Sequence, residues 1–268
     1  MKKLNFKNTT ILITGASSGI GKEFAKQFAS KGANLILTAR THSDLIHLAE
    51  YLVSEHKNIL IKTITADLSE LNGSRKLFEK INDLGLSVDY LINNAGFGKF
   101  CEFSGESFET YHKMLMLNIN ALVELTHLCL PAMKDKNSGG IINVASIASF
   151  QPLPYQTVYG ASKAFVLSFS EALTGELLDT NIRVMALCPG TTESRFMANA
   201  NADTSKMDLA PASEVVRAAL ISYDKNKMYT VSGKMNYLMS LIPRLVSRKR
   251  TVRIVVNMFK DSVLGKST

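Results

Sequence analysis

The chain has 268 residues, of which 46% are hydrophobic and 20% are charged, so it can build a large core and is not a chain that is disordered throughout. Its formal net charge of +8 is confined to one end: residues 225–268 carry ten Lys and Arg and one acid, a net +9, and the other 21 basic and 22 acidic residues leave residues 1–224 at −1. A domain that reads nucleic acid carries the positive charge itself, so we expect no nucleic-acid partner.

Apolar, β-branched strands alternate with amphipathic helices over most of the chain. This alternation predicts an α/β fold: a Rossmann-like, doubly wound parallel sheet between two helical layers, which is a three-layer αβα sandwich. The predicted strands are Thr9–Thr14, Asn34–Thr38, Ile59–Thr65, Val88–Ile92, Gly140–Ala145 and Ile182–Leu187. The predicted helices follow a turn at residues 15–21 and lie at Ser43–Glu55, Ser69–Asp83, Ser107–Lys134 and Val158–Leu178.

The regular alternation ends after the sixth strand. Residues 191–213 are rich in Gly, Thr, Ser, Asn, Asp and Ala, and a loop of this length is usually functional or disordered. A helix at Ala212–Tyr223, a last strand at Met228–Ser232 and a pair of basic amphipathic helices over Asn236–Phe259, broken at Pro243, are predicted after it. No linker divides the body, so we expect one domain over residues 1–233 and a helical C-terminal extension over residues 234–268.

A glycine-rich turn, Gly15-Ala16-Ser17-Ser18-Gly19-Ile20-Gly21, lies directly between the first strand and the first helix. Glycines there permit a tight turn and the close approach of a pyrophosphate, while the helix N-terminus supplies free N–H groups and a positive dipole. A glycine turn without a ligand is the alternative, but the flanking strand and helix favour dinucleotide binding. The spacing is G-x-x-x-G-x-G, which differs from the common G-x-G-x-x-G fingerprint.

Further motifs follow this turn in a fixed order: Asn93-Asn94-Ala95-Gly96, Asn118, Ser146, Tyr159 with Lys163, and Pro189-Gly190. Together with the glycine turn they resemble the signature of the classical short-chain dehydrogenase/reductase family, over about residues 9–194. The resemblance implies an NAD or NADP cofactor, hydride transfer to or from a small-molecule substrate, and a homodimer or homotetramer. It also implies that the loop at residues 191–213 closes over the substrate.

The end of the second strand, Leu37-Thr38-Ala39-Arg40-Thr41, helps to choose the cofactor. An enzyme that prefers NAD usually ends this strand with an acid for the ribose 2′-hydroxyl. Alignment with the family puts Ala39 at that position, and Arg40 after it is a permanent cation that can bind a 2′-phosphate in bidentate fashion. We therefore expect NADP(H) in preference to NAD, with Arg40 and Ser17 at the 2′-phosphate; an ordinary surface arginine is the alternative.

The resemblance implies further cofactor contacts along the rim of the sheet. Asp67 matches an aspartate that contacts adenine, although it could equally cap a helix that begins near Ser69. The segments that follow the fourth and sixth strands match contacts to the ribose and the nicotinamide, although simple turns would also explain their Gly and Pro. The complete set of expected cofactor contacts is Gly15, Ser17, Ser18, Gly19, Ile20, Gly21, Arg40, Asp67, Leu68, Asn94, Ala95, Gly96, Tyr159, Lys163, Pro189, Gly190 and Thr192.

Tyr159 and Lys163 are four residues apart on one face of a predicted helix. A free tyrosine has a pKa of about 10, and a neighbouring ammonium can lower it by roughly 1–3. The resemblance implies that Tyr159 exchanges a proton with the substrate oxygen, that Ser146 binds this oxygen, and that Lys163 lowers the pKa of Tyr159 and holds the nicotinamide ribose. It also implies that Asn118 interrupts its helix and positions a proton-relay water.

These residues predict an NADP(H)-dependent oxidoreductase that transfers a hydride between the nicotinamide and a carbonyl or secondary alcohol. A catalytically idle NADP-binding sensor, and a membrane-surface module that acts through the basic tail, stay open as alternatives. Several apolar residues favour a hydrophobic ketone or aldehyde, although each could equally belong to the core or to a dimer contact: Phe97, Phe100, Phe103, Phe150, Leu153, Phe196 and Met197.

We expect a cytoplasmic protein, because Asn and Thr interrupt the first ten residues where a signal peptide would be apolar and because no apolar run reaches about 18 residues. Three cysteines without C-x-x-C spacing indicate a reducing compartment and predict no metal site. The basic C-terminal extension could lie on an anionic membrane, or it could pack on the body or on a second subunit; both interpretations stay open.

Overall fold

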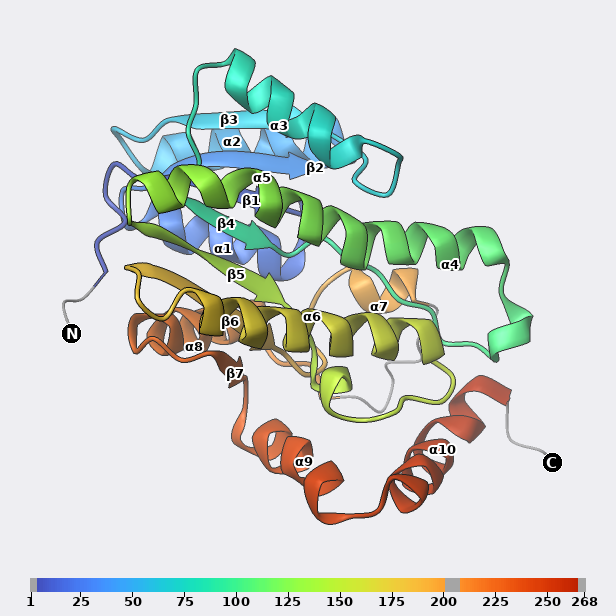
Figure 1. Cartoon of the computed structure of the whole chain (residues 1–268). Coiled ribbons are helices and arrows are strands. Elements are labelled where there is room, and N and C mark those ends of the chain that lie inside the picture. The colour runs from blue at the N-terminus through green and yellow to red at the C-terminus, as the bar shows by residue number, and fades with distance from the viewer. Residues whose placement is uncertain (1–3, 201–207, 265–268) are drawn as a thin grey trace.

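Seven parallel strands form one sheet in the order β3-β2-β1-β4-β5-β6-β7 (Figure 1). The computed structural model describes residues 4–200 and 208–264, so residues 201–207 of the predicted substrate loop lie outside the described residues. The strands are β1 (Thr10–Thr14), β2 (Asn34–Ala39), β3 (Ile61–Thr65), β4 (Tyr90–Asn93), β5 (Gly139–Val144), β6 (Ile182–Cys188) and β7 (Tyr229–Val231).

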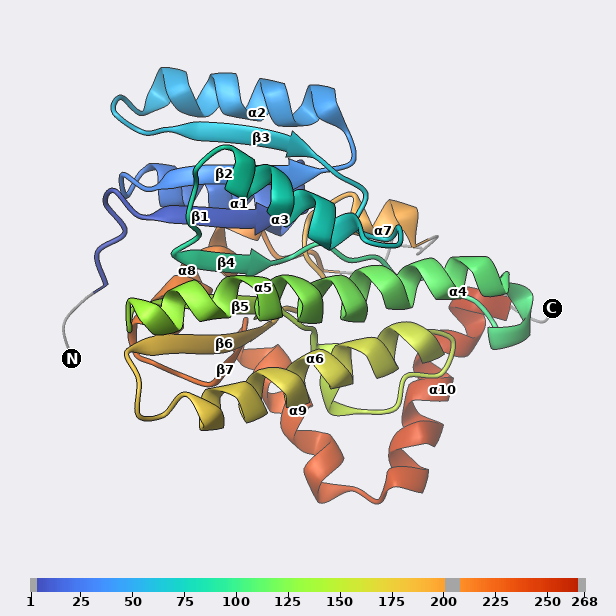
Figure 2. The ribbon, with the colours of Figure 1, turned by 45° about the horizontal axis from the view of Figure 1, so that its top comes forward.

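Helices cover both faces of this sheet (Figures 1 and 2). One layer contains α1 (Gly19–Ala29), α2 (His42–Glu55) and α8 (Ala212–Asp224). The other layer contains α3 (Gly73–Asp83), α5 (Ala121–Asp135) and α6 (Thr157–Glu176). The predicted three-layer αβα sandwich with a Rossmann-like parallel sheet is therefore confirmed.

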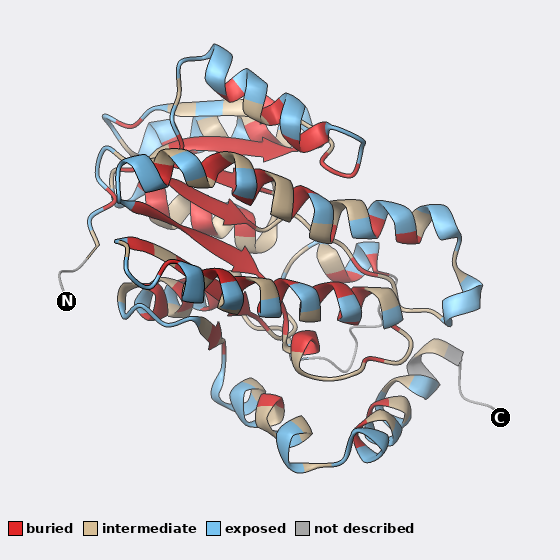
Figure 3. Ribbon diagram, viewed as in Figure 1, coloured by how far each residue is buried: buried red, intermediate tan, exposed pale blue. Residues whose placement is uncertain are grey.

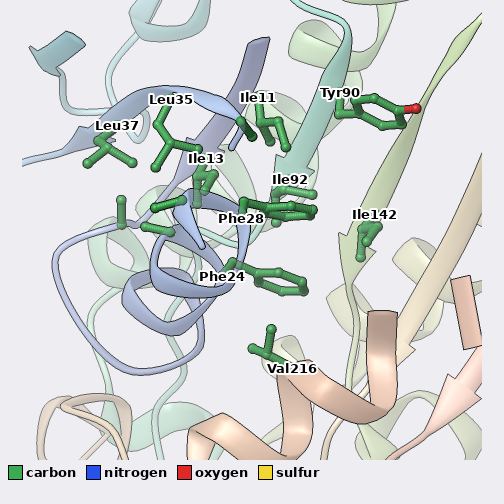
Figure 4. Packing of buried hydrophobic residues seen from close by; sticks show 14 of the residues in the cluster. Ile11, Ile13, Phe24, Phe28, Leu35, Leu37, Tyr90, Ile92, Ile142 and Val216 are labelled. Carbon is green, nitrogen blue, oxygen red and sulfur yellow. The ribbon is translucent and has the colours of Figure 1, made fainter. Parts of the chain in front are cut away.

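Alternate residues of the central strands point into two separate cores, which is why these strands are largely apolar. Ile11 and Ile13 of β1 pack with Phe24 and Phe28 of α1 in one core (Figure 4). Leu12, between them, packs in the core on the opposite face. The buried strands at the centre of Figure 3 carry these side chains, so burial on both faces holds the strand ends in register.

A buried chain of polar side chains ties two central strands to the helices above them. Asn93 of β4 donates through Nδ2 to Asn143 Oδ1 of β5 at 2.9 Å and to Thr126 Oγ1 of α5 at 3.1 Å. Asn143 in turn donates to Ser170 Oγ of α6 at 2.9 Å. Because buried polar groups need partners, this network fixes α6 relative to the carboxyl end of β5.

Two predicted helices differ from the observed ones. The helix expected at Ser69–Asp83 begins at Gly73, because Asn72 adopts a left-handed conformation with φ 60° and a turn precedes it. The helix expected at Ser107–Lys134 consists of α4 (Phe108–Leu115), a π-helical turn (Met116–Asn120) and α5. The interruption expected at Asn118 is thus present as one wide turn.

The C-terminal extension forms α9 (Lys234–Leu245) and α10 (Arg248–Leu264), and the predicted break at Pro243 is wrong. Pro243 lies in the last turn of α9, where its missing N–H removes a single helical hydrogen bond. The chain breaks instead at residues 246–247: Val246 is extended, with φ −117° and ψ 142°.

The continuous stretch Phe108–Asp135 is 28 residues long and is apolar enough to cross a membrane by length and composition, although Glu109, Lys113 and Glu124 interrupt its apolar runs. In the fold, however, Leu125, Cys129 and Met133 of this stretch pack on the sheet. We assign it to the core, since a core helix meets the same criterion.

We expect Asn143→Leu to lower the free energy of unfolding by about 1–3 kcal/mol, because it leaves the buried Asn93 amide without a principal acceptor. Urea denaturation measures this change. Asn82→Leu, the same substitution on the exposed face of α3, is the control and should change stability by no more than about 0.5 kcal/mol. Equal stability of the two variants would contradict a structural role for the network.

Candidate functional site

A cavity of about 390 Å³ lies along the carboxyl ends of the strands. Segments that follow β1, β2, β3, β4, β5 and β6 all contribute to its wall. In parallel α/β sheets this edge is where ligands bind, near the point where the strand order reverses between β1 and β4. The structure therefore brings motifs that are distant in the sequence to one cavity.

The glycine turn is held close to the sheet by Asn94. The Asn94 amide donates to the carbonyl oxygens of Thr14 at 2.9 Å and Gly15 at 3.1 Å. Gly15 and Gly19 adopt φ of +64° and +51°, a region that favours glycine. A methyl group at Gly21 would collide with the Gly15 carbonyl and the Asn94 amide. Gly21 therefore does not line the cavity itself; it permits the close packing that shapes the turn.

Arg40, Ser17 and Thr41 all line the cavity. Arg40 is exposed, and within the described residues no carboxylate lies within salt-bridge distance of it. The neighbouring Arg195, which the sequence did not single out, also lines the cavity, but its guanidinium is paired with Asp44. Arg40 thus presents an uncompensated positive charge to the cavity.

Asp67 lies in the cavity wall and does not cap α3. Its Oδ1 accepts hydrogen bonds from the backbone N–H of Ser69 at 2.9 Å and from the Ser69 hydroxyl at 2.6 Å. The N-cap of α3 is Asn72. The capping interpretation of Asp67 is therefore wrong, since its carboxylate closes a turn that faces the cavity.

Ser146, Tyr159 and Lys163 meet in the middle of the cavity. Ser146 follows β5, and its Oγ accepts the N–H of Ala148 at 3.1 Å. Lys163 Nζ donates to the carbonyl oxygen of Val144 at 2.7 Å and lies 5.9 Å from the centroid of the Tyr159 ring. Helix α6 carries both the phenol and the ammonium, β5 carries the carbonyl, and the segment after β5 carries the hydroxyl.

Burial dominates the ionisation of this group. It raises the pKa of Tyr159 to about 12, and the Ser146 side chain opposes this effect in part. It lowers the pKa of Lys163 to about 8. Loss of solvent disfavours both charged forms, and the ammonium is directed at the Val144 carbonyl, so burial outweighs any effect of Lys163 on the Tyr159 phenol. That Lys163 lowers the pKa of Tyr159 stays a prediction.

Asn118 lies behind the cavity wall rather than in it. Its Oδ1 accepts the N–H of Phe97 at 3.1 Å, and its Nδ2 donates to the Phe97 carbonyl at 3.0 Å and to Ser162 Oγ at 3.1 Å. A methyl group at Gly96 would lie 3.0 Å from Asn118 Oδ1 and 3.4 Å from Lys163 Nζ. The amide therefore clamps the segment after β4 against α6, close to the ammonium.

The segment after β6 completes the rim. Pro189 accepts the N–H of Ile147 at 3.0 Å, which joins the ends of β5 and β6. Thr192 Oγ1 donates to the Gly190 carbonyl at 3.0 Å. Pro189, Gly190 and Thr192 all line the cavity, as do the other expected cofactor contacts apart from Gly21.

The side of the cavity beyond Tyr159 is apolar. Four of the seven predicted wall residues are there, namely Phe100, Leu153, Phe196 and Met197, whereas Phe97, Phe103 and Phe150 do not line it. The Phe196 ring lies 5.3 Å from that of Tyr159.

Three apolar residues of the C-terminal extension also line this side, namely Met239, Met258 and Phe259. The rings of Phe259 and Phe100 pack edge to face at 5.8 Å. Sequence reasoning missed these contacts; the one signal was the i, i+4 spacing of Val255 and Phe259, which indicates a buried helical face but not its partner. Within the described residues, no group of three or more His, Cys, Asp or Glu could hold a metal ion.

The arrangement fits a dinucleotide, because a positive-φ glycine turn at a helix N-terminus, a cation and a buried phenol line one cavity. A family model described as short chain dehydrogenase matches residues 9–205. The chain is 35% identical over 188 residues to sulfoacetaldehyde reductase 2 of Chromohalobacter salexigens, which covers 69% of this chain and 73% of that protein.

Two solved structures are similar along nearly the whole chain. A short-chain dehydrogenase from Sphingobium yanoikuyae in complex with NADPH is 29% identical, with a TM-score of 0.79 and coverage of 97% of this chain and 98% of that chain. A bulky-bulky ketone specific alcohol dehydrogenase from Comamonas testosteroni is 30% identical, with a TM-score of 0.75 and coverage of 97% and 95%. The chain therefore belongs to the short-chain dehydrogenase family of oxidoreductases.

Proposed function

We propose that residues 1–233 form a single catalytic domain that transfers a hydride between NADP(H) and a carbonyl or secondary alcohol, with Tyr159 as the general acid–base. The observation that carries this proposal is the meeting of Ser146, Tyr159 and Lys163 in the cavity that the glycine turn also lines. A buried phenol, a hydroxyl and an ammonium that line one cavity suit proton transfer to an oxygen atom.

The residues present would hold NADP(H) along the rim. The turn at residues 15–21 and the N-terminus of α1 would take the pyrophosphate, Asp67 and Leu68 the adenine, and Ala95 and Gly96 the adjoining ribose. The segment 189–192 would take the nicotinamide. Bound there, the nicotinamide supplies or accepts the hydride.

Arg40 supports the preference for NADP(H). β2 ends at Ala39, a position at which an acid would repel a 2′-phosphate. The guanidinium of Arg40 lies in the cavity wall and has no carboxylate partner in the described part of the chain. A guanidinium and the Ser17 hydroxyl together can bind a phosphate with charge-assisted hydrogen bonds. The NADPH complex of the Sphingobium relative is consistent with this assignment.

Ser146, Tyr159 and Lys163 would each have a different part in the proposed proton transfer. Ser146 Oγ already accepts the Ala148 N–H, so its own hydrogen is available to donate to the substrate oxygen. Tyr159, with its pKa raised to about 12, is protonated at neutral pH and can give this proton during reduction. Lys163 donates one N–H to the Val144 carbonyl oxygen, which leaves two N–H groups that could bind ribose hydroxyls beside the phenol.

The apolar side of the cavity supports a hydrophobic ketone or aldehyde as substrate. Phe100, Leu153 and Phe196 face it together with Phe259 of α10. Aromatic and aliphatic walls with few polar groups bind apolar carbonyl compounds and leave orientation to Ser146 and Tyr159. The Comamonas relative, described as specific for bulky-bulky ketones, is consistent with such a wall.

We propose a cytoplasmic homodimer or homotetramer. Exposed apolar side chains on the layer of α4 to α6, which include Phe108, Leu115 and Phe165, support association of copies through these helices. A cytoplasmic protein of this kind is compatible with peripheral contact between its C-terminal extension and a membrane.

Tyr159→Phe should lower kcat for ketone reduction at least about 100-fold, because it removes the proton donor and leaves the ring that packs on Phe196. The NADPH dissociation constant should stay within a few-fold of the wild-type value. Steady-state kinetics and fluorescence titration with NADPH measure the two effects.

Tyr155→Phe removes the same atom from a neighbouring tyrosine that does not line the cavity, and it should retain wild-type turnover. Wild-type turnover in Tyr159→Phe would exclude Tyr159 as the acid. A wild-type protein that binds NADPH but reduces no ketone, aldehyde or alcohol partner would favour the sensor interpretation.

Arg40→Asp should shift the ratio of kcat/KM for NADPH over NADH toward NADH by at least about tenfold, because it replaces the 2′-phosphate partner with a repelling charge. Lys57→Asp makes a similar charge change at an exposed position outside the cavity and should leave the ratio unchanged. An unchanged ratio in Arg40→Asp would remove the assignment of Arg40.

The raised pKa of Tyr159 predicts opposite pH profiles for the two directions. Oxidation needs the phenolate as proton acceptor, so its kcat/KM should rise with pH from 7 toward the pKa of about 12. Reduction needs the phenol and should keep its rate from pH 6 to 8. Initial rates in both directions at saturating cofactor measure the profiles, and an oxidation rate that levels off near pH 7 would contradict the raised pKa.

A further inference from the structure

Helix α9 exposes a stripe of apolar side chains to solvent, whereas a helix that packs on a protein core turns such a stripe inward. Met235, Leu238, Ile242 and Leu245 follow a 3-4-3 spacing, which places them in one stripe along the helix. All four are exposed, from 46% for Ile242 to 85% for Leu245. The face that packs on the body carries the buried Ser240 and the half-buried Met239, so the exposed stripe is a second apolar face. A stripe of this kind indicates a missing partner that is apolar.

Helix α10 exposes charge where α9 exposes apolar surface. Its inner side carries the buried Thr251 and Val255, while Lys249, Arg250, Arg253 and Lys260 are exposed. Arg244 and Arg248, on either side of the turn between the helices, are exposed as well. No carboxylate in the described part of the chain lies within salt-bridge distance of these cations.

The two helices leave the body as the arms of a V, with the turn at residues 246–247 at its tip (Figures 1 and 2). Figure 3 shows that much of both arms is exposed. The apolar stripe and the basic face are therefore presented together, away from the sheet.

We propose that α9 and α10 dock the protein on an anionic membrane surface. The stripe of α9 enters the boundary between headgroups and acyl chains, and the cations of α10 contact anionic headgroups. The inference concerns binding alone and does not depend on the proposed chemistry.

The exposed cations of α10 and the apolar stripe of α9 together favour an anionic membrane as the partner. A second copy of the chain would bring the same cations to the contact, and like charges repel. Nucleic acid would satisfy the cations but would leave the stripe of α9 in water. An anionic bilayer satisfies both.

The lengths of the helices indicate that they lie on the bilayer rather than cross it. α9 has 12 residues and α10 has 17, and at about 1.5 Å per residue both are shorter than the ~30 Å hydrocarbon core. Five cations on α10 would also oppose insertion across the core.

The docking surface adjoins the apolar side of the cavity. Met239 of α9 and Met258 and Phe259 of α10 line the cavity, and Met258 is also 51% exposed. The cavity wall thus reaches the surface at the helix that carries the basic face. A hydrophobic carbonyl compound dissolved in the membrane would meet the cavity at this place.

Co-sedimentation of the full chain with vesicles tests the docking. The wild type should pellet with phosphatidylcholine vesicles that contain phosphatidylglycerol, bind less at high salt and bind weakly to pure phosphatidylcholine. Leu238→Glu/Ile242→Glu should weaken binding at least about tenfold by removing apolar anchors. Arg250→Glu/Arg253→Glu should weaken it by a similar factor by reversing charge.

Two controls match these variants on exposed positions of the body. Leu71→Glu places a charge on an exposed leucine, and Lys76→Glu/Lys80→Glu reverses two exposed lysines of α3; both should bind vesicles like the wild type. Every variant should reduce a water-soluble ketone at the wild-type rate, which shows that it is folded. If no protein, wild type included, reduces any ketone, the proposed function fails while the vesicle result stands.

Three outcomes would overturn the proposal. The wild type could stay in the supernatant with both kinds of vesicle, or the controls could lose binding as much as the α9 and α10 variants. Alternatively, Leu238→Glu/Ile242→Glu could convert a dimer to a monomer in light scattering while vesicle binding is absent from the wild type. The last result would assign the stripe to a contact between copies.

Discussion

The hydrogen bond from the Lys163 ammonium to the Val144 carbonyl joins the helix that carries the phenol to the strand that ends at Ser146. Both partners are buried, so the ammonium is costly to place there, and burial lowers its pKa to about 8. The polar network from Asn143 to Ser170 makes a second link between the same strand and helix. The two links hold Ser146, Tyr159 and Lys163 in a fixed arrangement, which is the preorganisation that the proposed proton transfer would need.

Several polar side chains near the site hold backbone rather than ligand. The Asn94 amide donates its N–H groups to the glycine turn, and the Asn118 amide donates to Phe97 and Ser162. Both residues are therefore best understood as braces that set the distance between the turn, the segment after β4 and α6. Their side chains shape the cavity through the backbone that they hold, and the cofactor contact of Asn94 and the proton-relay role of Asn118 stay predictions.

Burial also favours the protonated form of the Tyr159 phenol. Its pKa is raised to about 12, because loss of the proton would leave a charge in an apolar environment. The ring of Phe259 packs on that of Phe100 in the apolar wall of the same cavity. The protonated phenol and the apolar wall thus have one physical origin, which is the exclusion of solvent.

The order of strands and helices, the glycine turn and the positions of Ser146, Tyr159, Lys163 and Arg40 were predictable from the sequence, because they depend on local periodicity and on motifs a few residues long. The start of α3 at Gly73, the helix break at residues 246–247 and the role of Asp67 were not, since each depends on which of several local hydrogen bonds forms. The contacts of Met239, Met258 and Phe259 with the cavity, the ionisation of Tyr159 and the outward stripe of α9 were decided only by tertiary structure. Burial and long-range packing depend on which surfaces meet, and residues more than a hundred positions apart in the chain carry no local record of that meeting.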